Sequence, residues 1–172
     1  MKKFIFSILL LLTAFSLKAE EGDTITFKSK NMLEWSDFKM IPNINDSSKV
    51  YLDVTIVTFP KKVNVWTGII SVESYAGIKR DSSWIKPQYK SPQLLDYVQL
   101  KYEIANYFAK KSEQAINKKK INVSFTNRIT KIVKLHIESM NQVFKEFDVE
   151  SDFGNNAEVF DNWKTKIEKE KL

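Results

Sequence analysis

The hydrophobic positions of this chain change their period near residue 91, from two residues to about 3.6. Before that point, residues 51–59 alternate between apolar and polar side chains, which is typical of a half-buried strand. Residues 63–75 alternate in the same way, and Gly68 inside this run indicates a bulge or a close backbone approach. With a break at residues 60–62 between them, the two runs predict an antiparallel hairpin.

After residue 91, apolar residues recur on one stripe of each of three predicted helices. Ser91 followed by Pro92 is typical of a helix start, because serine caps free N–H groups and proline has no N–H to leave unpaired. The pattern predicts strands within about residues 24–90 and helices at about residues 92–117, 126–147 and 156–171. Strands followed by helices predict an α+β fold, here as one domain of residues 20–172.

The first residues have the pattern of a targeting segment. Lys2 and Lys3 precede an apolar run at residues 4–17, and Ala19 is followed by the acidic pair Glu20-Glu21. This arrangement is typical of a cleaved secretory signal, and the run is shorter than the roughly 20 residues that span a bilayer. The sequence therefore predicts a signal peptide at residues 1–19 and a periplasmic or secreted protein.

Charge and composition narrow the classes of partner. Removing residues 1–19 takes away Lys2, Lys3 and Lys18 and lowers the formal net charge from +6 to +3. Such a balance does not indicate a nucleic-acid-binding protein, and the run Lys118-Lys119-Lys120 is interpreted as a solvated linker. The predicted last helix is too poor in large apolar residues to bind a membrane. We expect no nucleic-acid partner and, after signal cleavage, no membrane partner.

The residues that most often carry catalytic chemistry are scarce. The chain has no cysteine, which excludes disulfides, thiolate catalysis and a lipid-modified N-terminal cysteine. It has one histidine, His136, on the apolar stripe of the second predicted helix, where a hydrogen-bonded core residue is the favoured interpretation. A zinc or copper site built from several histidines is therefore excluded, and we expect neither a metal nor an organic cofactor.

An acidic stretch near residue 150 leaves one alternative open. Asp148, Glu150 and Asp152 alternate along the chain and could gather a weak calcium ion. An EF-hand loop that started at Asp148 would need glycine and glutamate where Phe153 and Val159 stand. The favoured interpretation is a polar connection between two helices.

Four segments of the chain, in order, resemble a family of bacterial secreted zinc-dependent proteases catalogued as domain of unknown function 922. The matching pieces are Leu33-Glu34-Trp35-Ser36-Asp37-Phe38, Ser83-Trp84 with the helix of residues 94–110, Phe147-Asp148-Val149-Glu150-Ser151-Asp152-Phe153-Gly154, and a last helix with Trp163. The resemblance spans about residues 32–172. It implies a zincin-like arrangement, in which a helix lies over an antiparallel sheet.

The chain differs from the family at the positions that carry the family's catalytic chemistry. In a His-Glu-x-x-His protease, two histidines one helical turn apart bind one Zn²⁺ and the glutamate activates the bound water. The corresponding positions here are Tyr97, Val98 and Lys101; the family's downstream glutamate falls at Asn106 and its closing-loop histidine at Phe153. The resemblance therefore implies a framework without metal ligands and without a general base.

These observations predict an exported, non-catalytic protein with a degenerate metalloprotease-like fold. One hypothesis is a peptide- or protein-binding groove lined by Trp66, Trp84, Tyr97 and Lys101 beneath the strand predicted at residues 63–75. A simpler one is an inert site, in which Tyr97 packs and Lys101 reaches solvent. Two other functions stay open: a hydrolase that uses another site, and a purely structural envelope-associated protein.

Overall fold

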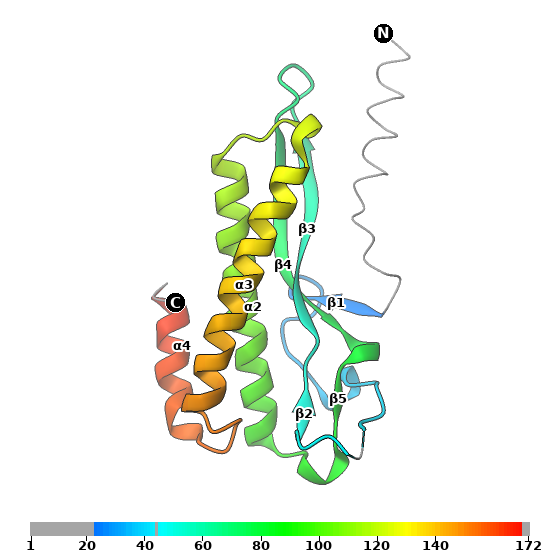
Figure 1. Ribbon diagram of the computed structural model, residues 1–172, viewed down its shortest axis with the longest axis vertical. Helices are drawn as coiled ribbons and strands as arrows, with labels where there is room; N and C mark the ends of the chain where they lie inside the picture. The colour runs from blue at the N-terminus through cyan, green and yellow to red at the C-terminus, as the bar shows by residue number, and fades with distance from the viewer. Residues whose placement is uncertain (1–22, 44, 170–172) are drawn as a thin grey trace.

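The computed structural model describes residues 23–43 and 45–169 and has an α+β architecture (Figure 1). A small antiparallel sheet lies beside a long helix, α2 (Pro92–Lys118), and two further helices pack against α2. The predicted signal peptide at residues 1–19 lies outside the described residues. Within the described ranges, no helix is long and apolar enough to cross a membrane.

The strands form two sheets. β1 (Thr24–Thr26), β4 (Ile70–Lys79) and β3 (Val54–Val63) make an antiparallel sheet in the order β1-β4-β3, and β2 (Val50–Tyr51) pairs with β5 (Trp84–Ile85). The predicted β3–β4 hairpin is present, but its predicted limits are wrong.

The differences in the hairpin have local physical reasons. β3 continues through Pro60 with a register shift between Pro60 and Lys62, because an edge strand tolerates a residue without an N–H on its open side. The predicted strand at residues 63–75 is interrupted by a turn, and β4 begins only at Ile70. Gly68 lies in that turn with φ +67°, a left-handed conformation that favours glycine.

The described residues form three α-helices: α2, α3 (Asn127–Glu150) and α4 (Phe160–Glu168). The Ser91 hydroxyl accepts a hydrogen bond from the Leu94 N–H at 3.1 Å, so α2 begins at Pro92 as predicted. The third predicted helix begins later than expected, since residues 157–159 form a 3₁₀ turn before α4. Short 3₁₀ turns also occur at Trp35–Asp37, Arg80–Ser82, Pro87–Tyr89 and Val123–Phe125.

Polar side chains of α2 bond the edge of β4 that lies away from β3 and that β1 leaves uncovered. β1 pairs only with residues 77–79, which leaves the N–H groups of residues 72, 74 and 76 on an open edge. They donate to Asn117 Oδ1 at 2.9 Å, Glu113 Oε2 at 2.8 Å and Asn106 Oδ1 at 3.4 Å, respectively. These bonds cover an exposed sheet edge and fix the position of α2 along the sheet.

The main core lies between the sheet and the helices and is rich in aromatic rings. Phe147 is fully buried and stacks on Tyr97 with a 5.3 Å centroid separation, and it contacts Trp163 at 5.1 Å. Pairs of this kind typically contribute about 0.5–1.5 kcal/mol beyond the area that they bury. They join α2, α3 and α4 around Tyr97, the first residue of the candidate site.

Candidate binding pocket

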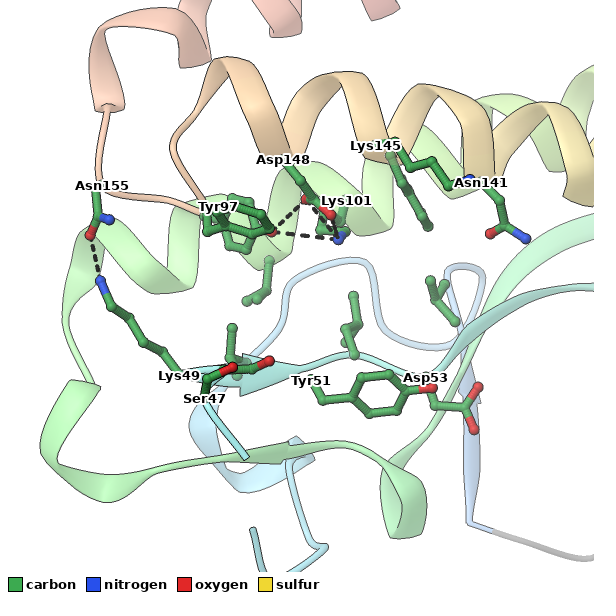
Figure 2. Close-up of a pocket in the computed structure, with 17 residues that line it drawn as sticks. Ser47, Lys49, Tyr51, Asp53, Tyr97, Lys101, Asn141, Lys145, Asp148 and Asn155 are labelled. Carbon is green, nitrogen blue, oxygen red and sulfur yellow. Dashed lines mark hydrogen bonds and ion pairs between the residues drawn. The ribbon is translucent and has the colours of Figure 1, made fainter. Parts of the chain in front are cut away.

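A pocket of about 810 Å³ lies between the chain segment of residues 47–54 and the helices α2 and α3 (Figure 2). One wall is formed by residues 47–54, which contain β2 and lead into β3. The opposite wall comes from three groups of residues: Tyr97, Val98 and Lys101 of α2; Asn141, Phe144, Lys145 and Asp148 of α3; and Phe153 and Asn155 of the loop after α3.

Three polar side chains form a bonded cluster on the helical wall of this pocket. The Lys101 ammonium donates to both oxygens of Asp148, at 2.8 and 2.9 Å, and the Tyr97 hydroxyl donates to Asp148 Oδ1 at 2.5 Å (Figure 2). The side chains of Lys101 and Asp148 are 16% and 20% exposed, so the ion pair is largely shielded from water. Tyr97 and Lys101 can share one carboxylate because they stand one helical turn apart.

Aromatic rings enclose the ammonium. Lys101 Nζ lies 4.9 Å from the centre of the Phe144 ring and 5.4 Å from that of Tyr97, within the range of cation–π attraction. Burial raises the pKa of Tyr97 far above its ordinary value, and the bond to Asp148 raises it further. Tyr97 is therefore a neutral hydroxyl at physiological pH.

Glycine is required beside the tyrosine. Gly154 has φ +86°, and a Cβ atom added to it would lie 2.9 Å from Tyr97 Cγ. The amide of Gln93, in the first turn of α2, donates to the carbonyls of Gly154 and Asn155 at 2.8 Å each. The loop after α3 is thus held against the start of α2, with Phe153 at the pocket and 61% exposed.

Two residues of the resembling segments bond parts of the chain that are distant in sequence, and one of them, Ser83, holds the other wall in place. The buried Ser83 hydroxyl accepts from the Asp53 N–H at 3.0 Å and donates to the Lys79 carbonyl at 2.8 Å. Gln99 accepts from the Leu33 N–H and donates to the Asn31 carbonyl, at 2.9 Å each. These bonds connect residues 31–33 and 53 to the core on which the pocket is built.

The structure brings together four of the five positions at which the chain departs from the family. Tyr97, Val98, Lys101 and Phe153 all line the pocket, although Val98 is fully buried. Asn106 does not line it and bonds the backbone of β4 instead. The expectation that Lys101 simply reaches solvent is wrong, because its ammonium is ion-paired to Asp148.

The predicted groove is wrong in two of its residues and in its strand. Trp66 is 94% exposed in the turn between β3 and β4, and Trp84 is buried and stacks on Tyr51. Neither lines the pocket, whose strand wall is formed by residues 47–54 and not by residues 63–75. Sequence patterns missed this wall because residues 43–49 have no periodicity.

The calcium interpretation of the acidic stretch is also wrong. Asp148 bonds Lys101, Glu150 accepts from the Trp163 indole at 2.8 Å, and Asp152 accepts from Asn155 at 3.1 Å, so the three carboxylates point to different partners. Across residues 23–43 and 45–169, no group of three or more His, Asp or Glu side chains is arranged to hold a metal ion. His136 is half-buried, and its Nδ1 bonds the Ile132 carbonyl at 2.8 Å.

Comparison of the chain with models of protein families, with curated proteins and with solved structures gives no match in any of the three. The resemblance to secreted zinc-dependent proteases therefore rests on the sequence segments alone.

Proposed function

We propose that the protein is an exported, non-catalytic relative of secreted zinc-dependent proteases whose former catalytic cleft is a peptide-binding pocket. The observation that carries this proposal is the bonded cluster of Tyr97, Lys101 and Asp148 on the wall of the pocket. In the proposed zincin-like arrangement, Tyr97 and Lys101 stand where a relative would bind its metal.

The chemistry of the cluster opposes peptide hydrolysis at a bound zinc ion. The Lys101 ammonium would repel a cation placed next to Asp148, by about 4 kcal/mol for each unit charge at about 4 Å and an effective dielectric of about 20. A dication would be repelled about twice as strongly. Val98 has no group that accepts a proton, and a general base typically contributes about 10²–10⁴-fold in rate.

The strand wall supports a peptide as the ligand. The carbonyl of Lys49 accepts from the Lys86 N–H. The carbonyl of Asp53 accepts from the Lys79 N–H of β4, and the Asp53 N–H donates to the Ser83 hydroxyl just before β5. Because backbone groups alternate in direction along a strand, those of residues 50, 52 and 54 point the opposite way. That outer edge runs along the pocket and is suited to pair with the backbone of an extended peptide.

The pocket's charges favour a peptide that carries a carboxylate. Lys49, Lys101 and Lys145 line the pocket together with Asp53 and Asp148, which leaves an excess of one positive charge. Lys145 is exposed on α3 and its side chain makes no hydrogen bond or ion pair with the described residues, so its ammonium is available to a ligand.

Peptide selection followed by filling of the pocket tests the proposal. A random peptide library is selected on the full chain, and affinities are compared with Asn141→Trp, which fills the pocket, and with Gln142→Trp. Gln142 is the matched control, since it is exposed on the same helix and does not line the pocket. The expected result is equal affinity for the wild type and Gln142→Trp, and at least about tenfold weaker binding to Asn141→Trp. Failure to select any peptide, or equal binding to all three proteins, contradicts the proposal.

A further inference from the structure

The fold joins two distant segments at the end of the molecule opposite the pocket (Figure 1). The turn between β3 and β4 is bonded to the connection between α2 and α3: the Val123 N–H donates to the Gly68 carbonyl, and the Ile70 N–H to the Ile121 carbonyl, at 2.9 Å each. The Asn122 amide also donates to the Thr67 carbonyl at 2.8 Å. We call this region, residues 60–70 and 118–131, the hairpin end.

The hairpin end is strongly and uniformly basic. Neither residues 54–72 nor residues 114–137 contain an aspartate or glutamate. The exposed cations of the hairpin end are Lys61, Lys62, Lys118, Lys119, Lys120, Arg128 and Lys131. One of them, Lys61, is paired with Glu73 of β4 at 2.9 Å. The remaining charges are left on the surface and create a field that attracts an anionic partner.

Large apolar side chains project from the same surface. Trp66 is 94% exposed, Val65 73% and Phe125 49%. The turn that carries Trp66 is well defined, since Asn64 Oδ1 accepts from the N–H groups of both Trp66 and Thr67, at 3.0 and 3.1 Å. The backbone of this turn is therefore held in place, and the Trp66 ring projects from it into solvent.

The combination fits a membrane surface better than a protein partner. Three apolar side chains are too few for a stable protein interface, which buries about 800 Å² on each partner. Shallow contact with a bilayer needs only a few such residues together with cations, and tryptophan is the residue that prefers the headgroup region. The expectation of no membrane partner was based on the last helix, which does not belong to this surface.

We propose that the hairpin end binds the surface of an anionic membrane, with the Trp66 ring in the headgroup region and the surrounding cations over the lipid phosphates. This inference is independent of the pocket and of its ligand. The apolar run at residues 4–17 would itself enter a bilayer, so a useful measurement has to report on Trp66 locally.

Tryptophan fluorescence provides that local signal. The full chain and Trp66→Phe are mixed with phosphatidylcholine vesicles that contain either no or about 30% phosphatidylglycerol, with brominated acyl chains as quenchers. The difference between the two proteins isolates Trp66. With anionic vesicles its emission is expected to shift to the blue and to be quenched; with neutral vesicles both changes are expected to be much smaller. Equal signals from Trp66 in both kinds of vesicle, or no signal in either, overturn the proposal.

Two triple variants test the charges. Lys118, Lys119 and Lys120 are changed to Gln in one, and the exposed residues Lys90, Lys164 and Lys169 in the other, which removes the same charge elsewhere. Each cation near an anionic surface strengthens binding about fivefold. The first triple is therefore expected to raise the lipid concentration that gives half of the Trp66 change by at least about tenfold, and the second to leave it nearly unchanged. Equal weakening in both triples, or a Trp66 shift with single-stranded oligonucleotides but not with anionic vesicles, contradicts the proposal.

Discussion

The two ends of this molecule use lysine in opposite ways. In the pocket, the Lys101 side chain is 16% exposed, bonds both oxygens of Asp148 and lies over two aromatic rings. At the hairpin end, residues 118–120 are exposed and make no ion pair with the described residues. A shielded charge with a partner belongs to the architecture, whereas an exposed charge without one is available to a ligand. The comparison predicts that mutations in the cluster of Tyr97, Lys101 and Asp148 affect folding and that mutations of the exposed cations at the hairpin end affect binding.

The largest expected effect follows from removing the carboxylate of the cluster. Asp148→Ala leaves an ammonium and a hydroxyl without their acceptor in a shielded site. Breaking a buried pair typically costs about 3–5 kcal/mol, and the partial exposure of this one reduces the expected loss of unfolding free energy to about 2–3 kcal/mol. Urea denaturation followed by circular dichroism measures it.

An exposed pair on α3 is the matched control. Lys134 and Glu138 lie 4.0 Å apart with side chains 77% and 58% exposed, so Glu138→Ala is expected to change stability by less than about 0.5 kcal/mol. Similar losses for the two variants would show that the cluster of Tyr97, Lys101 and Asp148 is no more than a surface contact.

Alanine substitutions of Gly68 at the hairpin end and Gly154 beside the pocket, both in left-handed conformations, compare the two ends in another way. Gly154→Ala places Cβ against the ring of Tyr97, which is stacked and cannot move, so a loss of about 2 kcal/mol is expected. Gly68→Ala meets the end of the Asn122 side chain, which can shift only by giving up its bond to the Thr67 carbonyl, and a loss of about 1–1.5 kcal/mol is expected. Thermal unfolding of both variants gives the order, and the reverse order would contradict the packing around Tyr97.

Alkaline pH provides a third test of the pocket. The pKa of Tyr97 in the folded protein is raised, so the unfolded chain loses this proton above about pH 10 while the folded protein keeps it. The stabilisation is fully present below pH 10 and is lost as the pH rises, by about 1 kcal/mol at pH 11. Tyr97→Phe should therefore reduce the slope of stability against pH above 10. Burial also raises the pKa of Tyr102, so part of the slope should remain. An unchanged slope in Tyr97→Phe would place this hydroxyl in water.

The smallest expected effect is that of Phe153→Asn, which should change stability and peptide affinity in opposite directions. Phe153 has φ +50°, an unfavourable conformation for a residue with a bulky side chain. Phe153→Asn should stabilise the protein by about 0.5 kcal/mol, because asparagine tolerates this conformation. The same change removes an exposed ring from the pocket and should weaken the selected peptides. A variant that gains stability and keeps full peptide affinity would exclude Phe153 from the binding surface.

The helices could be predicted from local signals, whereas features that depend on contacts between distant residues could not. The start of α2 depends on Ser91 and Pro92, which are neighbours in sequence, and its apolar stripe repeats along one element. The passage of β3 through Pro60 depends on β3 being an edge strand, which is a property of the whole sheet. The pairing of Lys101 with Asp148 joins residues 47 positions apart, and no periodic pattern connects them. The resemblance indicates Tyr97, Val98 and Lys101, but the bonds from Tyr97 and Lys101 to Asp148 are evident only from the structure.

The most direct test of the central claim is a combined measurement of metal content and peptide cleavage on the purified chain. The protein is exposed to Zn²⁺, dialysed, analysed for bound metal, and assayed on a peptide library with and without a chelator. The account predicts less than about a tenth of an equivalent of tightly bound metal and no cleavage in either condition, because the Lys101 ammonium repels a dication. One equivalent of zinc, with cleavage that disappears on chelation and in Asp148→Ala, would contradict it.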